Sequence, residues 1–298
     1  MGMPAWRVRF GLLVLVSFLV LPLRCDGASA AVGRQDDGVA VLEYHDVDPH
    51  QREQPGVIHP QDLRREIEIL KARGYTFLSA DQFHAYLEGR FVLHGRGVLV
   101  TFDDGYEGVY TYAFPILQQE HVPALVFPIM KWFSPGAGEP PYSRHLTRDE
   151  ARVMLASGLV FFGGHSYDGH EPVVVAPNGR LGPFWTSLAW LPTGRRETVA
   201  EYEARLQKDT ALMTDELHAI GVAHPVDFAW PGGHYSLISR AIVSHAGYRY
   251  LYTGIFGVNR PGQNPAFIRR IYPSDRPDVL IVTLDRAFAG HIAVRVAR

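Results

Sequence analysis

The sequence predicts an α/β fold with a mostly parallel sheet, and two features of its hydrophobic pattern support that prediction. Short apolar runs alternate with amphipathic helical segments along most of the chain, which is typical of right-handed β-α-β units. Residues 98–102 are continuously apolar or β-branched, as in a strand that is buried on both faces of a sheet. The 298 residues are 47% hydrophobic and 20% charged, so the chain can bury a full core.

In the first half of the chain, strands are predicted where short apolar runs are bounded by turn residues. The segment 61–73 is predicted to be a helix because Leu63, Ile67 and Leu70 fall on one face and Gly74 follows as a stop signal. In order, the predicted elements are a strand at 39–42, a helix at 61–73, a strand at 98–102, a helix at 110–121 and, after Pro123, a strand at 124–129.

The second half repeats the alternation. Thr147 has the position of an N-cap, with Glu150 three residues later as its partner in a capping box. Gly221 follows the longest helical pattern as its stop signal. The predicted elements are helices at 148–157, 198–220 and 236–245, strands at 159–162, 226–230, 248–252 and 267–271, and irregular stretches at 134–143 and 171–195.

The amino terminus has the pattern of a secretory signal peptide over residues 1–30. Arg7 and Arg9 precede an apolar run at 10–21, and residues 28–30 read Ala-Ser-Ala, a cleavage signal. We therefore expect residues 31–298 to form the mature domain, exported to the periplasm, the medium or the cell surface, without a stable membrane span. An uncleaved amino-terminal anchor is the alternative. The net charge of −2 gives no indication of a nucleic-acid partner, and a single cysteine, Cys25, excludes a thiolate site in the mature chain.

Two adjacent carboxylates, Asp103 and Asp104, stand at the carboxyl end of the predicted strand 98–102. Sites in parallel α/β folds form at this end of the sheet. Because side chains alternate along a strand, both carboxylates reach one site only where the strand turns into its loop, and Gly105 is consistent with that turn. The alternative is a pair of helix-capping aspartates at the start of the helix that follows.

Two histidines, His165 and His170, lie on one short loop after the strand at 159–162. Two imidazoles and a carboxylate from another strand end form a plausible site for a divalent metal. The alternative is an exposed loop that holds histidines by chance, since the chain has 14 of them.

Together these motifs resemble the NodB-type polysaccharide deacetylases, carbohydrate esterase family 4, and most of all its biofilm poly-N-acetylglucosamine deacetylase branch. Residues 44–46 (Tyr-His-Asp), 101–105, 165–170 and 228–233 carry the resemblance in family order. It implies a distorted (β/α) barrel with fewer than eight strands. It also implies removal of N-acetyl groups from poly-β-1,6-N-acetyl-D-glucosamine or a related amino-sugar polymer. Peptidoglycan or chitin deacetylation, or a degenerate polysaccharide-binding module, are the alternatives.

By motif position, the resemblance implies roles for four residues. Asp103 resembles the general base. Asp104, His165 and His170 resemble the ligands of one divalent ion, for which we expect zinc, with nickel or cobalt as alternatives.

The sequence departs from the family pattern in three places. Four residues separate the two histidines, where three are commoner. The family's Arg-x-Pro-Tyr motif reads Ala-Trp-Pro-Gly at 229–232, so that Gly232 offers only its backbone amide to an oxyanion, with Tyr235 or His234 as candidates for the missing ring. No residue is assigned as the general acid, although residues 283–285 (Thr-Leu-Asp) lie near the expected position.

Two further residues are candidates for the site. His45 ends the first strand and could line the same mouth, with a buried histidine paired to Asp46 or to the backbone as the alternative. Arg270 or its neighbour Arg269 could orient one of the two aspartates in place of the missing arginine.

Overall fold

The computed structural model describes residues 2, 37–50, 56–133, 144–273 and 276–290. All of these except Gly2 belong to one compact unit, Gly33–Arg298. The predicted signal peptide, apart from Gly2, and the irregular stretch at 134–143 lie outside the described residues.

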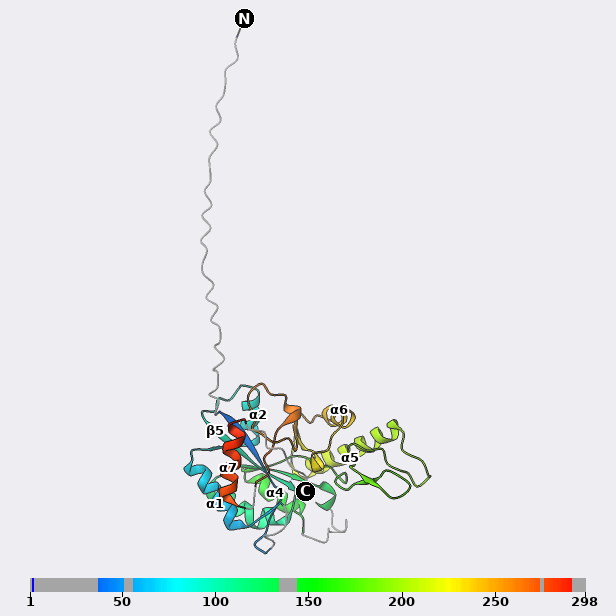
Figure 1. Cartoon of the computed structure of the whole chain (residues 1–298), viewed down its shortest axis with the longest axis horizontal. Helices are drawn as coiled ribbons and strands as arrows, with labels where there is room; N and C mark the ends of the chain where they lie inside the picture. Colours follow the sequence, from blue (N-terminus) through cyan, green and yellow to red (C-terminus); the bar gives the residue numbers. More distant parts are fainter. Residues whose placement is uncertain (1, 3–36, 51–55, 134–143, 274–275, 291–298) are drawn as a thin grey trace. The chain divides into compact units, whose positions relative to one another are not determined.

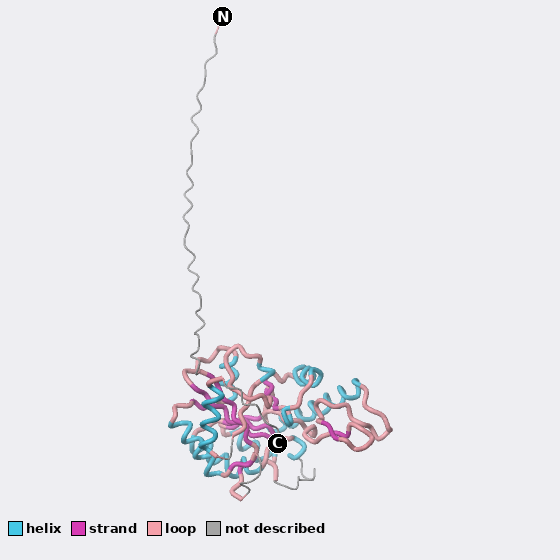
Figure 2. The backbone as a smooth tube through the Cα atoms, viewed as in Figure 1, coloured by secondary structure: helices cyan, strands magenta, loops and turns pink. Residues whose placement is uncertain are grey.

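The fold is α/β, with a mostly parallel central sheet (Figures 1 and 2). Four strands are hydrogen-bonded side by side in the order β1-β5-β6-β7, all parallel, and β4 pairs with the start of β5. These strands are β1 (Gly38–Tyr44), β4 (Thr76–Phe77), β5 (Arg96–Asp104), β6 (Ala124–Pro128) and β7 (Val160–Phe162).

The remaining parallel strands extend the arrangement of the main sheet into an incomplete barrel. β10 (Asp227–Ala229) pairs with β11 (Tyr250–Tyr252). Only single parallel bridges connect this pair to the main sheet, so the sheet itself is not closed. The bridges join Gly164 to Phe228, Tyr252 to Ile268, and Leu42 to Ile271. The bridge from Leu42 to Ile271 places the segment around Ile271 beside β1. Residues from both ends of the compact unit therefore lie close together at the carboxyl ends of the strands, which we call the rim.

Helices follow most of the strands, as the alternation predicted. They are α1 (Pro60–Ala72), α2 (Ala80–Leu87), α3 (Phe114–Glu120), α4 (Arg148–Ala156), α5 (Val199–Ile220), α6 (Leu237–His245) and α7 (Pro277–Phe288). The predicted capping box of Thr147 and Glu150 is present, and Gly221 ends α5 at a φ of 109°. None of the helices in the described part of the chain is long and apolar enough to cross a membrane.

The short elements lie in the connections between these helices and strands. They are β2 (Asp46–Val47), β3 (Val57–Ile58), β8 (Val173–Val174), β9 (Leu181–Gly182), the π-helical turn η1 (Val109–Ala113) and the 3-10 turns η2 (Met130–Phe133), η3 (Pro231–Gly233) and η4 (Pro265–Phe267).

The structure differs from the sequence-based prediction in several places. The strand expected at 267–271 is not formed, because η4 occupies its start and only Ile268 and Ile271 make single bridges. Helices α2 and α7 were not predicted, and the stretch 171–195, expected to be irregular, contains a small hairpin of β8 and β9.

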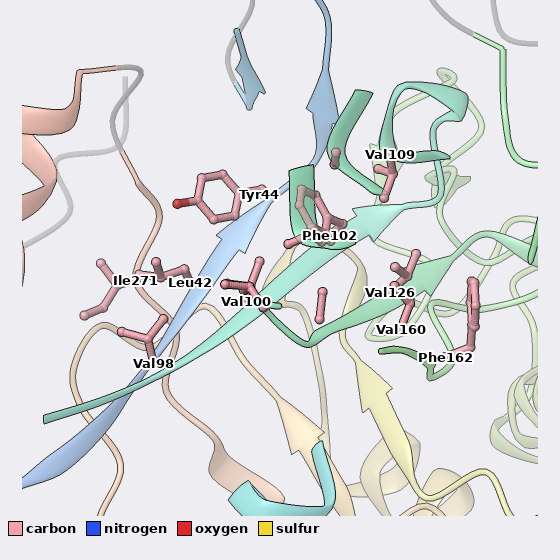
Figure 3. Close-up of a cluster of buried hydrophobic side chains, with 14 of the residues drawn as sticks. Leu42, Tyr44, Val98, Val100, Phe102, Val109, Val126, Val160, Phe162 and Ile271 are labelled. Carbon is pink, nitrogen blue, oxygen red and sulfur yellow. The ribbon is translucent and has the colours of Figure 1, made fainter. Parts of the chain in front are cut away.

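The two faces of β5 pack in different hydrophobic clusters, and this packing determines which way the polar side chains at its carboxyl end point. Val98, Val100 and Phe102 face one hydrophobic cluster, which also receives side chains from the covering helices (Figure 3). Leu99 belongs to the other cluster, with Val39, Val41, Leu125 and Phe127 from neighbouring strands. By the two-residue period of a strand, Thr101 and Asp103 follow Leu99 on that second face.

Candidate metal and catalytic site

The turn after β5 brings both adjacent carboxylates to one rim. Asp104 has a φ of 67° and Gly105 a φ of 79°, so the strand breaks its alternation at this point. A side chain at Gly105 would be about 2.5 Å from Cβ of Pro128, so only glycine fits beside β6. The sequence-based expectation that the strand turns at Asp103 and Asp104 agrees with this geometry.

Asp104, His165 and His170 form a compact group of potential metal ligands. The Nε2 atoms of His165 and His170 lie 3.4 Å and 3.3 Å from Oδ1 of Asp104. Ligand atoms at about 2.0–2.1 Å from a tetrahedral zinc ion are about 3.3 Å from one another. Oδ1 of Asp104 is buried and makes no hydrogen bond. A buried carboxylate oxygen without a donor fits a site for a cation.

The backbone fixes the orientation of one of the two imidazoles. Nδ1 of His165 lies 2.9 Å from the carbonyl oxygen of Ala229 on β10. Since a carbonyl only accepts, Nδ1 carries a proton, and Nε2 is the ring nitrogen that faces Asp104. Nε2 is therefore the atom that would bind a cation in place of a proton.

The electrostatics of the group favour an ionised Asp104. Burial by itself would raise the pKa of this carboxyl, but the imidazoles of His165 and His170 outweigh burial and hold its pKa well below the usual range. Burial lowers the pKa of His170. An ionised carboxylate and a neutral imidazole are the forms that bind divalent ions.

Asp103 belongs to a second, adjacent group. Nη1 of Arg270 lies 2.8 Å from each of its carboxylate oxygens, and Nε of Arg270 lies 3.3 Å from Glu43. Asp103 and Arg270 are 2% and 3% exposed, so this pair is hidden from solvent. Burial would lower the pKa of Arg270, but the carboxylates of Asp103 and Glu43 raise it above the ordinary value. Arg270, rather than Arg269, is therefore the arginine that contacts one of the two aspartates.

His45 lies within this second group. One ligand-type atom of each of Glu43, His45 and Asp103 falls within 4.8 Å of the others. The Nδ1 atom of His45 is buried and has no hydrogen-bond partner, and its ring is 5.7 Å from that of Tyr272. These contacts do not match a histidine whose ring nitrogens are both satisfied by Asp46 or by the backbone.

A cavity of about 390 Å³ opens beside the metal-ligand group. Its wall includes His170 and Gly232, together with the apolar side chains of Pro183, Phe184 and Trp185. Gly232 has a φ of 60° in the turn after β10, a conformation that favours glycine. Gly232 thus lies on the same cavity wall as His170.

Two sequence-based candidates lie away from the site. The ring of Tyr235 packs 5.6 Å from Trp230 and 6.0 Å from Phe267, as part of the partly buried core, and it is absent from the cavity wall. Leu284 is buried in α7, and Asp285 pairs with Arg96 at the opposite end of β5. Residues 283–285 therefore do not supply an acid to this rim.

Two further polar groups near the rim, Glu43 and His145, were not predicted from the sequence. Glu43 contacts Arg270, and it was detectable as the one charged residue inside an otherwise apolar strand. His145 is 6% exposed, and its ring packs against Trp132 at 4.1 Å and Tyr106 at 4.7 Å. Nothing in the local sequence around His145 marks it as buried.

Comparison with known proteins gives one consistent relationship. A family model described as polysaccharide deacetylase matches residues 93–251. The poly-beta-1,6-N-acetyl-D-glucosamine N-deacetylase of Escherichia coli strain K12 is 28% identical over 253 residues, which is 82% of this chain. The enzyme of the same name from Staphylococcus epidermidis is 32% identical over 111 residues, 37% of each chain.

Solved structures agree. A de-N-acetylase from Aggregatibacter actinomycetemcomitans has a TM-score of 0.73 and 26% identity, and covers 80% of this chain and 96% of that one. IcaB from Ammonifex degensii has a TM-score of 0.70 and 29% identity, and covers 85% and 98%. The match to the E. coli relative spans only 38% of that protein's length.

Proposed function

The chain belongs to the polysaccharide deacetylase family, and we propose that it hydrolyses N-acetyl groups on an amino-sugar polymer with a divalent cation at Asp104, His165 and His170. The arrangement at the end of β5 carries the proposal. Asp104 faces the imidazoles of His165 and His170. Its neighbour Asp103 forms an ion pair with Arg270. Ligand and base are therefore separate groups, as amide hydrolysis by an activated water requires.

The residues divide the chemistry as follows. A cation in the ligand group would polarise the acetamide carbonyl and lower the pKa of a water molecule. Asp103, fixed by Arg270, takes the proton of the attacking water. The amide of Gly232, on the cavity wall beside His170, is the donor that we assign to the oxyanion.

We assign protonation of the leaving amine to His45. It is an imidazole within reach of Asp103, and its buried Nδ1 is free of hydrogen bonds. An amine is a poor leaving group unless it is protonated as the C–N bond breaks, so the reaction needs a general acid in addition to the base Asp103.

For the substrate we propose poly-β-1,6-N-acetyl-D-glucosamine. The names of the relatives from E. coli and S. epidermidis support this choice, as does the four-residue spacing between His165 and His170. The aromatic wall formed by Phe184 and Trp185 is suited to the face of a sugar ring.

For the cation we propose zinc, because two imidazoles and one carboxylate leave an open position in a tetrahedral site. Nickel and cobalt are the alternatives. We also propose that the protein acts outside the cytoplasm, on the support of the signal-peptide pattern at residues 1–30.

The test is release of free amines from poly-β-1,6-N-acetyl-D-glucosamine oligomers by the purified chain with zinc, nickel or cobalt. Chitin oligomers and peptidoglycan are run in parallel. Asp103→Asn is the matched control, because it keeps the ligand group and is expected to bind metal without forming product. If the metal-loaded protein releases no amine from any polymer, the enzymatic proposal is refuted. Release from chitin alone would refute the proposed substrate.

A further inference from the structure

Helix α5 carries a buried carboxylate, Asp209, that the proposed chemistry does not use. Asp209 is 5% exposed. Within the described residues, no lysine, arginine or histidine forms an ion pair with it. A buried charge without a partner is costly unless hydrogen bonds replace the water that it loses.

The hydrogen bonds of Asp209 all come from one loop. Its Oδ1 accepts from the amide of Tyr167 at 3.0 Å and its Oδ2 from the amide of Asp168 at 2.8 Å. This is the loop between His165 and His170. Successive amides point inward to the carboxylate, so the chain curls around Asp209 and each of the two oxygens holds one peptide unit.

The opposite side of the same loop is held by η2. The amides of Met130 and Lys131 donate to the carbonyls of Ser166 and Tyr167 at 3.1 Å and 2.9 Å. Ser166 has a φ of 78°, a left-handed conformation that is unfavourable for a residue with a side chain. The loop is therefore a strained segment whose shape depends on hydrogen bonds from both sides.

The two histidines differ in how they are held. The ring of His165 is fixed by the carbonyl of Ala229. No hydrogen bond of this kind fixes the ring of His170 to any described residue, and its side chain is 32% exposed. The position of Nε2 of His170 relative to Asp104 therefore depends on the backbone that carries it.

We propose that Asp209 is a positioning residue of the metal centre, which places His170 against Asp104 by fixing the intervening loop. The inference rests on the proposed metal site. The carboxylate touches neither a ligand atom nor substrate, and it acts only through the amides of Tyr167 and Asp168. Outer groups that orient a ligand affect metal affinity by about 10- to 100-fold.

The test measures zinc and cobalt dissociation constants of the purified full chain by competition with a chelator. Asp209→Asn is nearly isosteric, but its amide nitrogen faces a backbone N–H and one hydrogen bond is lost. We expect metal binding about 10- to 100-fold weaker, with an altered visible absorption of the bound cobalt. Thr214→Val is the matched control, because it removes the Thr214–Tyr248 hydrogen bond on the same helix. Its metal affinity is expected to equal that of the wild type.

The outcomes separate the two proposals. If the wild type binds neither ion, the proposed metal site fails. If the wild type binds and Asp209→Asn binds equally well with the same cobalt spectrum, the positioning role is overturned. If Asp209→Asn does not fold, Asp209→Glu decides, because it keeps the charge and shifts the acceptors by one methylene. Unchanged affinity in that variant overturns the proposal, and weakened affinity supports it.

Discussion

Nη1 of Arg270 lies 2.8 Å from both carboxylate oxygens of Asp103, although the two residues are 167 positions apart in the chain. The segment before α7 thus supplies the guanidinium that forms an ion pair with the carboxylate near the end of β5. Arg270 also contacts Glu43 on β1, so the guanidinium lies between the buried Asp103 and the partly buried Glu43. A group held in this way has little freedom to rotate, which suits a base that must meet one water molecule.

We expect Arg270→Lys to lower kcat/KM by about tenfold or more, because the guanidinium holds Asp103 through Nη1 while its Nε contacts Glu43 and the carbonyl of Thr253, and a single ammonium cannot keep both sets of contacts. Metal content is expected to stay near that of the wild type. Arg269→Lys is the control, since Arg269 is exposed. Steady-state kinetics and elemental analysis check both. Full activity in Arg270→Lys would contradict the assigned orienting role.

Asp104→Asn and His165→Ala are each expected to abolish stoichiometric metal binding. Each removes one of the three proposed ligands, in which Nε2 of His165 and Nε2 of His170 lie 3.4 Å and 3.3 Å from Oδ1 of Asp104. Asp103→Asn should keep the metal and lose activity. Elemental analysis after gel filtration separates the two groups, and retention of one equivalent by Asp104→Asn would exclude this ligand set.

His45→Asn is expected to lower kcat on an acetylated amino sugar by about 10²- to 10⁴-fold, the range of a missing general acid or base. The same variant should hydrolyse an aryl acetate nearly as well as the wild type, because a phenolate leaves without being protonated. Equal losses on both substrates would show that His45 acts other than as an acid.

Burial holds the pKa of His145 at about 4, below its ordinary value of about 6.5. Protonation therefore favours the unfolded chain. The corresponding stability is fully present above about pH 6.5 and is lost as the pH falls towards 4. We expect the free energy of unfolding of the metal-free wild type to drop between pH 7 and pH 4.5 by up to about 2 kcal/mol more than that of His145→Phe.

Urea titrations at the two pH values, with a chelator present, measure this difference. The ligand histidines titrate in both proteins, and their contribution cancels in the comparison. His218→Gln, at an exposed position on α5, should follow the wild type. Parallel pH curves for the wild type and His145→Phe would contradict the prediction.

Much of the fold was predictable because local signals agree with the final structure. The capping residues of α4 and α5 and the apolar run of β5 lie where the sequence places them. The segment at 267–271 was misread as a strand because buried Ile268 and Ile271 make only single bridges, whose positions are set by distant residues.

The ligand group was likewise predictable, because each member follows a strand end in a motif. The pairing of Arg270 with Asp103 and Glu43 was only partly predictable from the sequence. A buried arginine next to an exposed one has no local mark that tells them apart, and the choice is made by tertiary packing. Asp209 and His145 were missed for the same reason, since their contacts are all long-range.

The bridge between Leu42 and Ile271 joins the first strand to a segment near the end of the compact unit, and this bears on the order in which the site is completed during biosynthesis. The chain is made from its amino terminus, so Asp104, His165 and His170 leave the ribosome before Arg270. Until then, Asp103 and Glu43 would be two carboxylates with no guanidinium between them. We expect the rim to stay hydrated at this stage, and the burial of the base to be a late step that awaits the pairing of the first strand with nearly the last segment.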